Sequence, residues 1–497
     1  MEKEVAQILK ESIHNANISK KKEKKILSEV HEKCEKEITR KISIKEGATS
    51  SVMTGFGTDY LSPFALALNA NNAQIGFLSS FPGLISPIAQ IFGSRLMEKY
   101  SRKKIIVLFV ALQALMWLPI LALSFLLWAN IYPSALPYFL IALYTLLSVF
   151  GSIAGPSWFS LMGDLVPEKI RGKYFGNRNK ICGAVALISA ITAAFLLDFF
   201  RTKGLVLIGF AIIFFLASIF RLISANLFKK HYNPEFKLQD GYYFSLWQFI
   251  KKAPGNNFGK FVIFISLMQF ATAIGGPFFA VYMLKNLNFS YTTFMLVNIS
   301  SSVFAILFMP IWGKFSDKYG NRELLRLGSI LVPLSPILWI FNASPSYLII
   351  VPQLVGGIGW AAFNLSASNF IYDSVSVPRR GICVAYYNVL IGLGVFLGAS
   401  LGGLLAFYLN ISFMNKLLFI FLISGILRAL VSGIMLPQIK EIKPVKKPKN
   451  AILYFKEIRP VRGVLMEITN DMFGIGKKIG RIYKNKKSRK AKKKDRG

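Results

Sequence analysis

Acidic residues, histidine and cysteine are all scarce in this chain of 497 residues. It has 24 aspartates and glutamates against 60 lysines and arginines, with three histidines and three cysteines. The cysteines (Cys34, Cys182 and Cys383) lie far apart without CxxC spacing, so they predict neither a disulfide framework nor a zinc site. No GxxxxGK[ST] loop and no cluster of His, Asp or Cys occurs, which argues against an ATP-driven pump and against a membrane-embedded enzyme. We therefore expect no enzymatic activity, no cofactor and no metal.

Apolar residues are abundant instead. They make up 53% of the chain, whereas charged residues make up only 17%, a composition that soluble domains rarely have. Between about residues 47 and 436, apolar stretches of roughly 18 to 25 residues recur, and each is long enough to cross the bilayer as a helix. This pattern predicts an all-α, polytopic membrane protein.

Twelve such stretches divide six and six around a polar segment. We expect spans near 49–70, 73–94, 104–128, 134–163, 180–199, 204–228, 259–284, 291–314, 323–342, 346–373, 381–409 and 413–436. The predicted domains are an N-terminal extension (1–46), a six-helix bundle (47–228), a central loop (229–258), a second six-helix bundle (259–436) and a basic tail (437–497).

The basic residues gather in the loops on one predicted side of the membrane. These loops hold 22 lysines and arginines, whereas the loops on the other side hold four. The positive-inside rule makes the basic side cytoplasmic. Both termini and the central loop are therefore predicted on the cytoplasmic side of a cell membrane. Because the basic residues behind the net charge of +36 lie overwhelmingly on one predicted side, we do not expect nucleic acid as a partner.

Motifs from the first half return in the second half in the same order. Asp164, Arg171-Gly172 and Asn179 reappear as Asp373, Arg380-Gly381 and Asn388, at a constant offset of 209. Three further pairs follow with small changes of offset: Arg221 with Arg428, Pro63-Phe64 with Pro277-Phe278, and "EKYSRK" at 98–103 with "DKYGNR" at 317–322. Four matches in one order predict an internal duplication of six helices in parallel orientation.

At these residues the chain resembles the major facilitator superfamily of secondary transporters. The stretch "GKFSDKYGNR", with Gly313, Asp317 and Arg322, is similar to the charged signature that this family carries after the eighth span. The spacing from acid to Arg-Gly is similar to its motif after spans four and ten. The resemblance covers about residues 47–436, implies two six-helix bundles that move against each other, and names no substrate.

The repeated charged residues at helix ends are candidate gates. Carboxylates set against arginines and helix ends form charge-assisted hydrogen bonds that hold in one arrangement of two bundles and break in another. We predict that eight residues latch the cytoplasmic side when the cavity faces outward: Glu98, Arg102, Asp164, Arg171, Asp317, Arg322, Asp373 and Arg380. The alternative is that they set topology and cap helices.

Asp59 is the one carboxylate that the sequence places near the middle of a span. It lies in "TGFGTDYLSPF", where Gly55, Gly57 and Pro63 weaken the helix. An ionisable side chain at that depth is costly unless it serves a function, so Asp59 is our candidate for binding substrate or a coupling proton. A neutral structural role stays open as the alternative.

The resemblance also implies that spans one, four, seven and ten line a central cavity. The candidate lining residues are then Asp59, Ser152, Gln269, Thr272, Trp360 and Asn364, with Asn298 adding a polar position on span eight. For each one, a hydrogen bond between helices is the alternative role. For Arg221 and Arg428, snorkelling or an internal salt bridge is favoured over contact with substrate.

Both tails are strongly basic. The spacing of apolar residues in 1–46 predicts two short amphipathic helices broken near "NANISKKK". The tail from Pro437 either lies on anionic lipid or is a solvated tail.

The sequence as a whole predicts a transporter of a small solute that works by alternating access, as a monomer, with proton coupling through Asp59 as the preferred form. The alternatives are a facilitated uniporter, a drug or solute exporter, and a membrane scaffold or sensor that does not transport.

Overall fold

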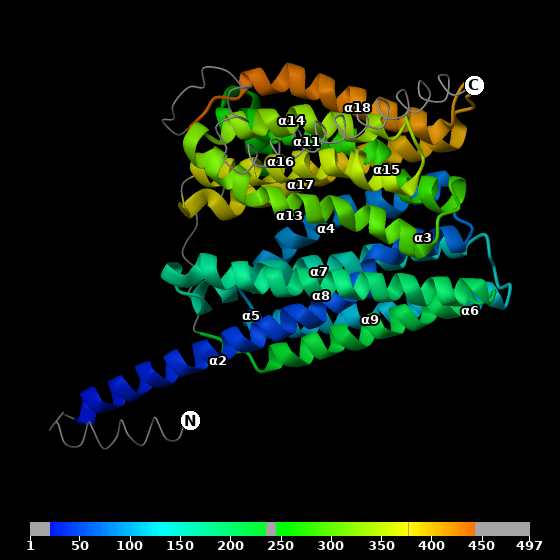
Figure 1. Cartoon of the computed structure of the whole chain (residues 1–497). Helices are drawn as coiled ribbons and strands as arrows, with labels where there is room; N and C mark the ends of the chain where they lie inside the picture. The colour runs from blue at the N-terminus through cyan, green and yellow to red at the C-terminus, as the bar shows by residue number, and fades with distance from the viewer. Residues whose placement is uncertain (1–19, 235–244, 376, 443–497) are drawn as a thin grey trace, which may run out of the picture.

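The structure is a computed structural model that describes residues 20–234, 245–375 and 377–442 (Figure 1). For residues 20–28, 168–169 and 377–381 it describes the backbone alone. Every regular element in these ranges is a helix. The first half contains α2 (Lys20–Phe56), η1 (Thr58–Tyr60), α3 (Leu61–Ala67), α4 (Asn72–Leu96), α5 (Arg102–Leu115), α6 (Trp117–Trp128), α7 (Leu136–Leu165), α8 (Glu168–Thr202) and α9 (Val206–Lys229).

The second half begins with the short α10 (Leu246–Lys252) and η2 (Ala253–Gly255). It continues with α11 (Asn257–Gly275), α12 (Phe278–Val281), η3 (Tyr282–Asn286), α13 (Tyr291–Tyr319), α14 (Asn321–Leu338), α15 (Pro345–Ile350), α16 (Pro352–Ser374), α17 (Val377–Tyr408), α18 (Lys416–Met435) and η4 (Leu436–Gln438). Figure 1 shows the halves as two helical layers, with the first half below the second. The all-α membrane fold predicted from the sequence is thus confirmed.

Ten helices in the described ranges are long and apolar enough to cross a membrane. They coincide with ten of the twelve predicted spans. The first predicted span is instead built from the end of α2, η1 and α3, because the helix breaks at Gly57. The ninth corresponds to α14, whose first turns carry Arg322, Glu323 and Arg326 and so leave a shorter apolar stretch.

The N-terminal extension and the first span are one continuous helix. The expectation of short amphipathic helices is wrong for the described part, because α2 runs unbroken for 37 residues across the predicted boundary at residue 46. The described part of the chain begins at Lys20, so the first of the two predicted helices and most of the predicted break near "NANISKKK" lie outside the described residues. Figure 1 shows α2 projecting beyond the other helices of its half.

Large apolar side chains fill the interior of each half. In the first half Phe64 packs edge-on against Phe214 at a ring-centroid distance of 4.9 Å, and Trp117 stacks on Phe214 at 5.4 Å. These rings come from α3, α6 and α9 and are shielded from solvent. This packing holds α3 in place although it is only seven residues long.

The two halves meet along α4 and α17, where small residues permit close backbone contact. A Cβ atom on Gly76 would lie 2.5 Å from the carbonyl oxygen of Ala399, and one on Gly392 would lie 2.4 Å from that of Gly83. Glycine is therefore required at both positions, as at many contacts between membrane helices.

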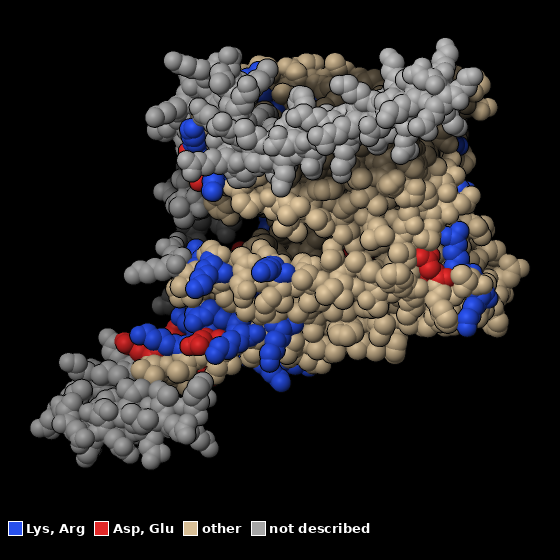
Figure 2. All heavy atoms as spheres, viewed as in Figure 1, with Lys and Arg blue, Asp and Glu red and all other residues tan. Residues whose placement is uncertain are grey.

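Charged side chains concentrate at one end of the bundle, which we call the basic end. It is the end at which α4, α7, α9, α13 and α16 finish, and Figure 2 shows lysine and arginine gathered there on the first half. The other end, which we call the opposite end, holds Asp198, Arg201 and Lys203.

Candidate functional site

A cavity of about 670 Å³ lies between the halves. The first half contributes η1, α3 and α4 to its wall, and the second contributes α11 to α14 and α16 to α18. Its polar lining includes the hydroxyl groups of Ser62, Ser79, Thr272, Ser301, Ser302 and Ser335, the amides of Asn298 and Gln353, and the charged side chains of Asp59 and Arg428. A cavity of this size accommodates a small metabolite.

Four of the predicted site residues meet in this cavity: Asp59, Thr272, Asn298 and Trp360. Gln269 and Asn364 lie about one turn from Thr272 and Trp360 in α11 and α16, and neither belongs to the lining. Ser152 lies in α7, which contributes no residue to the wall.

Asp59 faces the cavity because the helix breaks beside it. After Phe56 the chain forms a short 3-10 turn, and the packing of Gly57 against the Trp117 ring leaves no space for a side chain. Tyr60 anchors the turn by donating a hydrogen bond to the Ala190 carbonyl. Asp59 is exposed between these two buried neighbours, and its carboxylate has no hydrogen bond or ion pair with any described residue.

The second half has a similar break at the cavity. Here α11 ends at Gly275, and Gly276 and Pro277 line the wall before α12 begins. The ring of Phe279 then packs 4.7 Å from that of Trp339. Interrupted helices at the interface of repeats are typical of solute sites in transporters.

Arg428 lies in the cavity wall, although its sequence position favours snorkelling or an internal salt bridge. Its side chain is 3% exposed and donates hydrogen bonds to the carbonyls of Val332 (3.2 Å) and Thr272 (3.5 Å). Among the described residues its Nε has no partner, and its hydrogen bonds go to backbone carbonyls and not to a carboxylate. The expectation is therefore wrong for Arg428.

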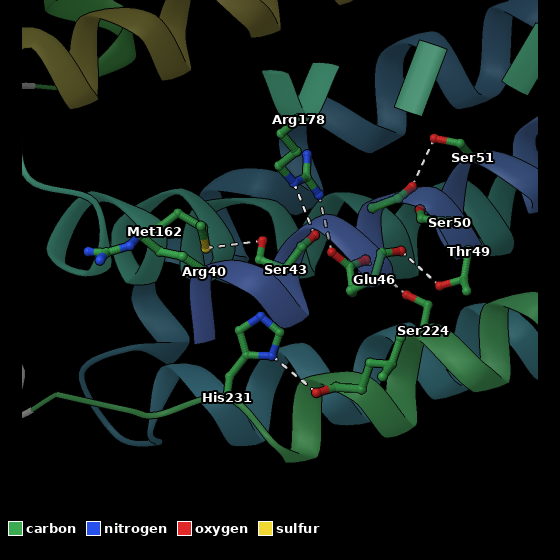
Figure 3. A network of polar contacts seen from close by, with 12 residues as sticks. Arg40, Ser43, Glu46, Thr49, Ser50, Ser51, Met162, Arg178, Ser224 and His231 are labelled. Carbon is green, nitrogen blue, oxygen red and sulfur yellow. Dashed lines mark hydrogen bonds and ion pairs between the residues drawn. The ribbon is translucent and has the colours of Figure 1, made fainter. Parts of the chain in front are cut away.

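For Arg221 the internal salt bridge is present. Its guanidinium lies 3.9 Å from the Glu46 carboxylate, and it donates to Gln113 Oε1 (2.8 Å) and to Ser50 Oγ (2.7 Å). Ser224 donates to the same carboxylate at 2.9 Å, as Figure 3 shows. The two related arginines thus have different surroundings.

Sequence reasoning missed Glu46 as a buried acid, because it placed this residue in the N-terminal extension. In the structure Glu46 is 2% exposed, and its second carboxylate oxygen pairs with Arg178 at 3.1 Å (Figure 3). Arg178 lies over the Trp158 ring. Arg221 within a predicted span was the available signal, since burying an arginine is costly unless an acid or a ligand balances its charge.

At the basic end of the first half, Arg102 and Asp164 form an ion pair. Arg102 begins α5 and is almost fully buried, and it lies 2.6 Å from the carboxylate at the end of α7. It also donates to Ser160 Oγ at 3.0 Å and to the Pro234 carbonyl at 3.2 Å. Arg171 donates to the carbonyls of Gly163 and Val166, and Glu98 is exposed.

The second half repeats this arrangement with an amide in place of the arginine. The Nδ2 of Asn321, at the start of α14, donates to the Asp373 carboxylate at 2.6 Å. Arg322 instead donates to the Ile439 carbonyl (2.6 Å) and to Glu323 (3.2 Å). Asp317 is exposed, and the side chain of Arg380 lies outside the described residues. Asn321 was missed, although the aligned stretches place it at the position of Arg102.

At the opposite end the halves are bound directly to each other. Both carboxylate oxygens of Asp198 in α8 accept hydrogen bonds from the first backbone amides of α13, those of Tyr291 (2.8 Å) and Thr292 (2.9 Å). Arg201 donates to the Phe289 carbonyl at 3.0 Å, and Asn72 donates to that of Ala406 at 2.9 Å. Figure 2 shows a hollow between the halves toward the basic end.

This architecture is that of a multi-pass membrane transporter, with two related helical halves, broken helices and a polar cavity between them. The sequence model of the Major Facilitator Superfamily matches the chain twice, over residues 47–279 and 261–476. The chain belongs to this family, as the resemblance predicted.

One relative is an uncharacterized MFS-type transporter of Methanocaldococcus jannaschii, 23% identical over 379 residues, which span 75% of this chain and 92% of the relative. A crystal structure of the nucleoside transporter NupG superposes with a TM-score of 0.61 at 16% identity and covers 80% of this chain and all of that one. The inward-open xylose transporter XylE from E. coli superposes at 0.58 with 14% identity, covering 82% and 97%.

Proposed function

We propose that this protein is a secondary active transporter of a small solute, coupled to protons through Asp59. The observation that carries the proposal is the cavity between the halves, into which Asp59 projects without a protein partner. A carboxylate in this position can exchange its proton with the solution that enters the cavity, and it can do so only while that side is open.

The proposed cycle is alternating access. The halves are bound at the opposite end through Asp198, Arg201 and Asn72, which supports a state open toward the basic end. We infer that the basic end faces the cytoplasm of a cell membrane, because lysine and arginine are retained on that side. The predicted gate residues would close this end in the other state, after rearrangement of the Arg102–Asp164 pair.

The test is transport by purified protein in liposomes, with a solute panel and an imposed pH gradient. We expect Asp59→Asn to abolish accumulation driven by the gradient and to preserve exchange of solute across the membrane. The matched control is Glu37→Gln, since Glu37 is exposed on α2 and pairs only with Lys41 at 3.2 Å. Glu37→Gln should accumulate solute like the unchanged protein.

Two results would count against this function in different ways. Full accumulation by Asp59→Asn would remove the proton role of Asp59 and favour facilitated uniport or another coupling ion. No flux and no stabilisation by any solute in the panel would favour a scaffold or sensor, because a ligand of the folded state raises its thermal stability.

A further inference from the structure

The cavity wall contains a buried cation, Arg428, whose charge no described residue balances. We propose that the transported solute carries an anionic group, a carboxylate or a phosphate, and that Arg428 binds it. The proposal deepens the transport function above and rests on it. It rests on three observations: the partners of Arg428, the loss of the polar network that surrounds its counterpart, and the other side chains of the cavity.

The contacts of Arg428 leave hydrogen-bonding capacity unused. A guanidinium has five N–H donors and always carries its charge. Among the described residues Arg428 donates to two backbone carbonyls, at 3.2 and 3.5 Å, while its buried Nε has no partner. Carbonyl groups accept hydrogen bonds but do not neutralise the charge. A buried charge without a counter-ion is strongly unfavourable, so its occurrence in a cavity wall indicates a ligand that supplies the missing charge.

Comparison of the halves shows that the counter-ion was not retained in the second half. Arg221 is surrounded by Glu46, Ser50, Gln113 and Ser224. The offset of 214 that relates Pro63 to Pro277 places Lys260 at the position of Glu46 and Phe264 at that of Ser50. The offset of 219 between the aligned loop motifs places Val332 at the position of Gln113, and the offset of 207 between the arginines places Val431 at that of Ser224.

Every polar side chain around the first arginine thus aligns with an apolar or basic residue in the second half. The Val332 carbonyl takes the place of the Gln113 amide as acceptor. The same basic residue is satisfied within the protein in one half and faces the cavity in the other. Arg221 therefore stabilises the fold, whereas Arg428 is available to a solute.

The remaining lining fits a small polar anion. Serine hydroxyls that donate to no described residue, such as those of Ser62 and Ser301, can donate hydrogen bonds to carboxylate or phosphate oxygens. Asp59 lines the same cavity, and its ionised form repels an anion. Proton binding at Asp59 and anion binding at Arg428 therefore favour each other, which couples the two in the symport direction.

The test is thermal stabilisation of the purified full-length protein by matched pairs of solutes. Small carboxylic acids and organic phosphates are compared with the corresponding amides and alcohols. We expect an anionic member to stabilise the protein and its neutral partner to have no effect. Arg428→Gln should weaken binding of that anion about tenfold or more, which is the loss expected for a hydrogen-bonded charge pair. Arg326→Gln, at an exposed residue that pairs with Glu323, is the control.

A second pair of variants keeps the test sound if Arg428→Gln fails to fold. Thr272→Glu places a carboxylate in the cavity wall beside Arg428, where it should replace the anion, prevent its binding and raise the melting temperature. Thr272→Gln has the same size without the charge and should not raise the melting temperature. Equal melting temperatures of the two variants would contradict the proposal.

The failures of the two proposals can be told apart. Stabilisation and gradient-driven flux of a neutral solute, with unchanged affinity in Arg428→Gln, would overturn anion recognition and leave the transport function standing. No stabilisation and no flux with any solute would overturn both.

Discussion

At the scale of single residues, the partners of a charged side chain show whether it stabilises the fold or is available to a solute. Glu46 is enclosed by Arg178, Arg221 and Ser224 from two other helices, so its charge is fully used within the protein. Asp59 and Arg428 have no such partners among the described side chains. Substitutions at these positions should therefore affect different properties.

We expect Glu46→Gln to lower the thermal stability of the protein. The change leaves two largely buried guanidinium groups without a counter-ion, and removing one partner of a buried pair costs about 3 kcal/mol. The apparent melting temperature in detergent measures the loss. Glu37→Gln on the same helix removes an equal charge at an exposed site and should have no effect. A melting temperature unchanged by Glu46→Gln would mean that the network contributes little to stability.

His231 should make stability depend on pH below neutrality. Burial lowers the pKa of His231 from its ordinary value of 6.5 to about 4, and although its bond to the Leu227 carbonyl opposes the shift, the charges of Lys103 and Arg178 add to it. Between pH 6.5 and 4 the unfolded state therefore binds a proton that the folded state does not. The contribution of His231 to the free energy of unfolding should be fully present above pH 6.5 and should decline as the pH falls toward 4.

The measurement is the melting temperature of the protein and of His231→Gln from pH 7.5 to 4.5. Other groups titrate in both proteins, so the difference between the two curves isolates the histidine. The unchanged protein should lose more stability on acidification than the variant. Parallel curves would show that His231 is not the group responsible.

At the scale of elements, the start of α13 holds the two halves together. Helix N-termini carry unpaired amides and a partial positive charge, and here the carboxylate of Asp198 from the other half accepts two of these amides. The proposed alternating access requires this contact to break when the opposite end opens. Its strength should influence how often that end opens.

We expect Asp198→Asn to increase access to the cavity from the opposite end. Hydrogen bonds to a charged group contribute about 1.5–3 kcal/mol, so the open population should rise by tenfold or more. The assay is labelling of Ser302→Cys in the cavity wall with an impermeant thiol reagent, in protein without its three native cysteines. Thr202→Val nearby is the control, because Thr202 bonds only to its own helix. An equal labelling rate in Asp198→Asn and the unchanged protein would rule out the latch.

Much of the element structure follows from the sequence because uninterrupted apolar length determines a membrane helix. The ten long helices lie where their hydropathy places them. The first span is different, because the break at Gly57 depends on the Trp117 ring from α6, a tertiary contact. The continuity of α2 was missed for a related reason. Its polar residues, Glu46 among them, are buried by α8 and α9, and a single sequence does not show which polar residues find partners.

The candidate site was also predictable from the sequence only in part. Asp59 stands out because no other acid lies near the centre of a predicted span, and the structure places it in the cavity. Arg428 did not stand out, since its depth alone cannot distinguish a paired arginine from an unpaired one. The internal repeat contained the missing information: alignment of the halves places Val332 at the position of Gln113.

At the scale of the whole molecule, the halves are arranged alike, and hydrogen bonds of Asp198, Arg201 and Asn72 join them at the opposite end. In this structure Asp164 and Asp373 are each bound within their own half, by Arg102 and Asn321. The proposed latch requires them to contribute to closure of the basic end in the other state. It remains a prediction for that state.

We expect the double substitution Asp164→Asn and Asp373→Asn to shift the balance opposite to Asp198→Asn. Loss of the two carboxylates should disfavour the state closed at the basic end, so the Ser302→Cys label should react less from the opposite end. Glu37→Gln again supplies the control. Unchanged labelling and unchanged transport in the double variant would leave these residues as helix caps.

The length of α2 has a mechanical consequence. It packs against α8 and α9 as one rigid rod, so it must tilt with the first half. With about 1.5 Å of rise per residue, its 37 residues form a shaft of about 55 Å. Its outer tip therefore sweeps a wider arc than any point within the bilayer. A fluorophore near Lys20 would therefore be displaced further by a reorientation of the bundle than a label within the bilayer. That displacement can be followed on single molecules.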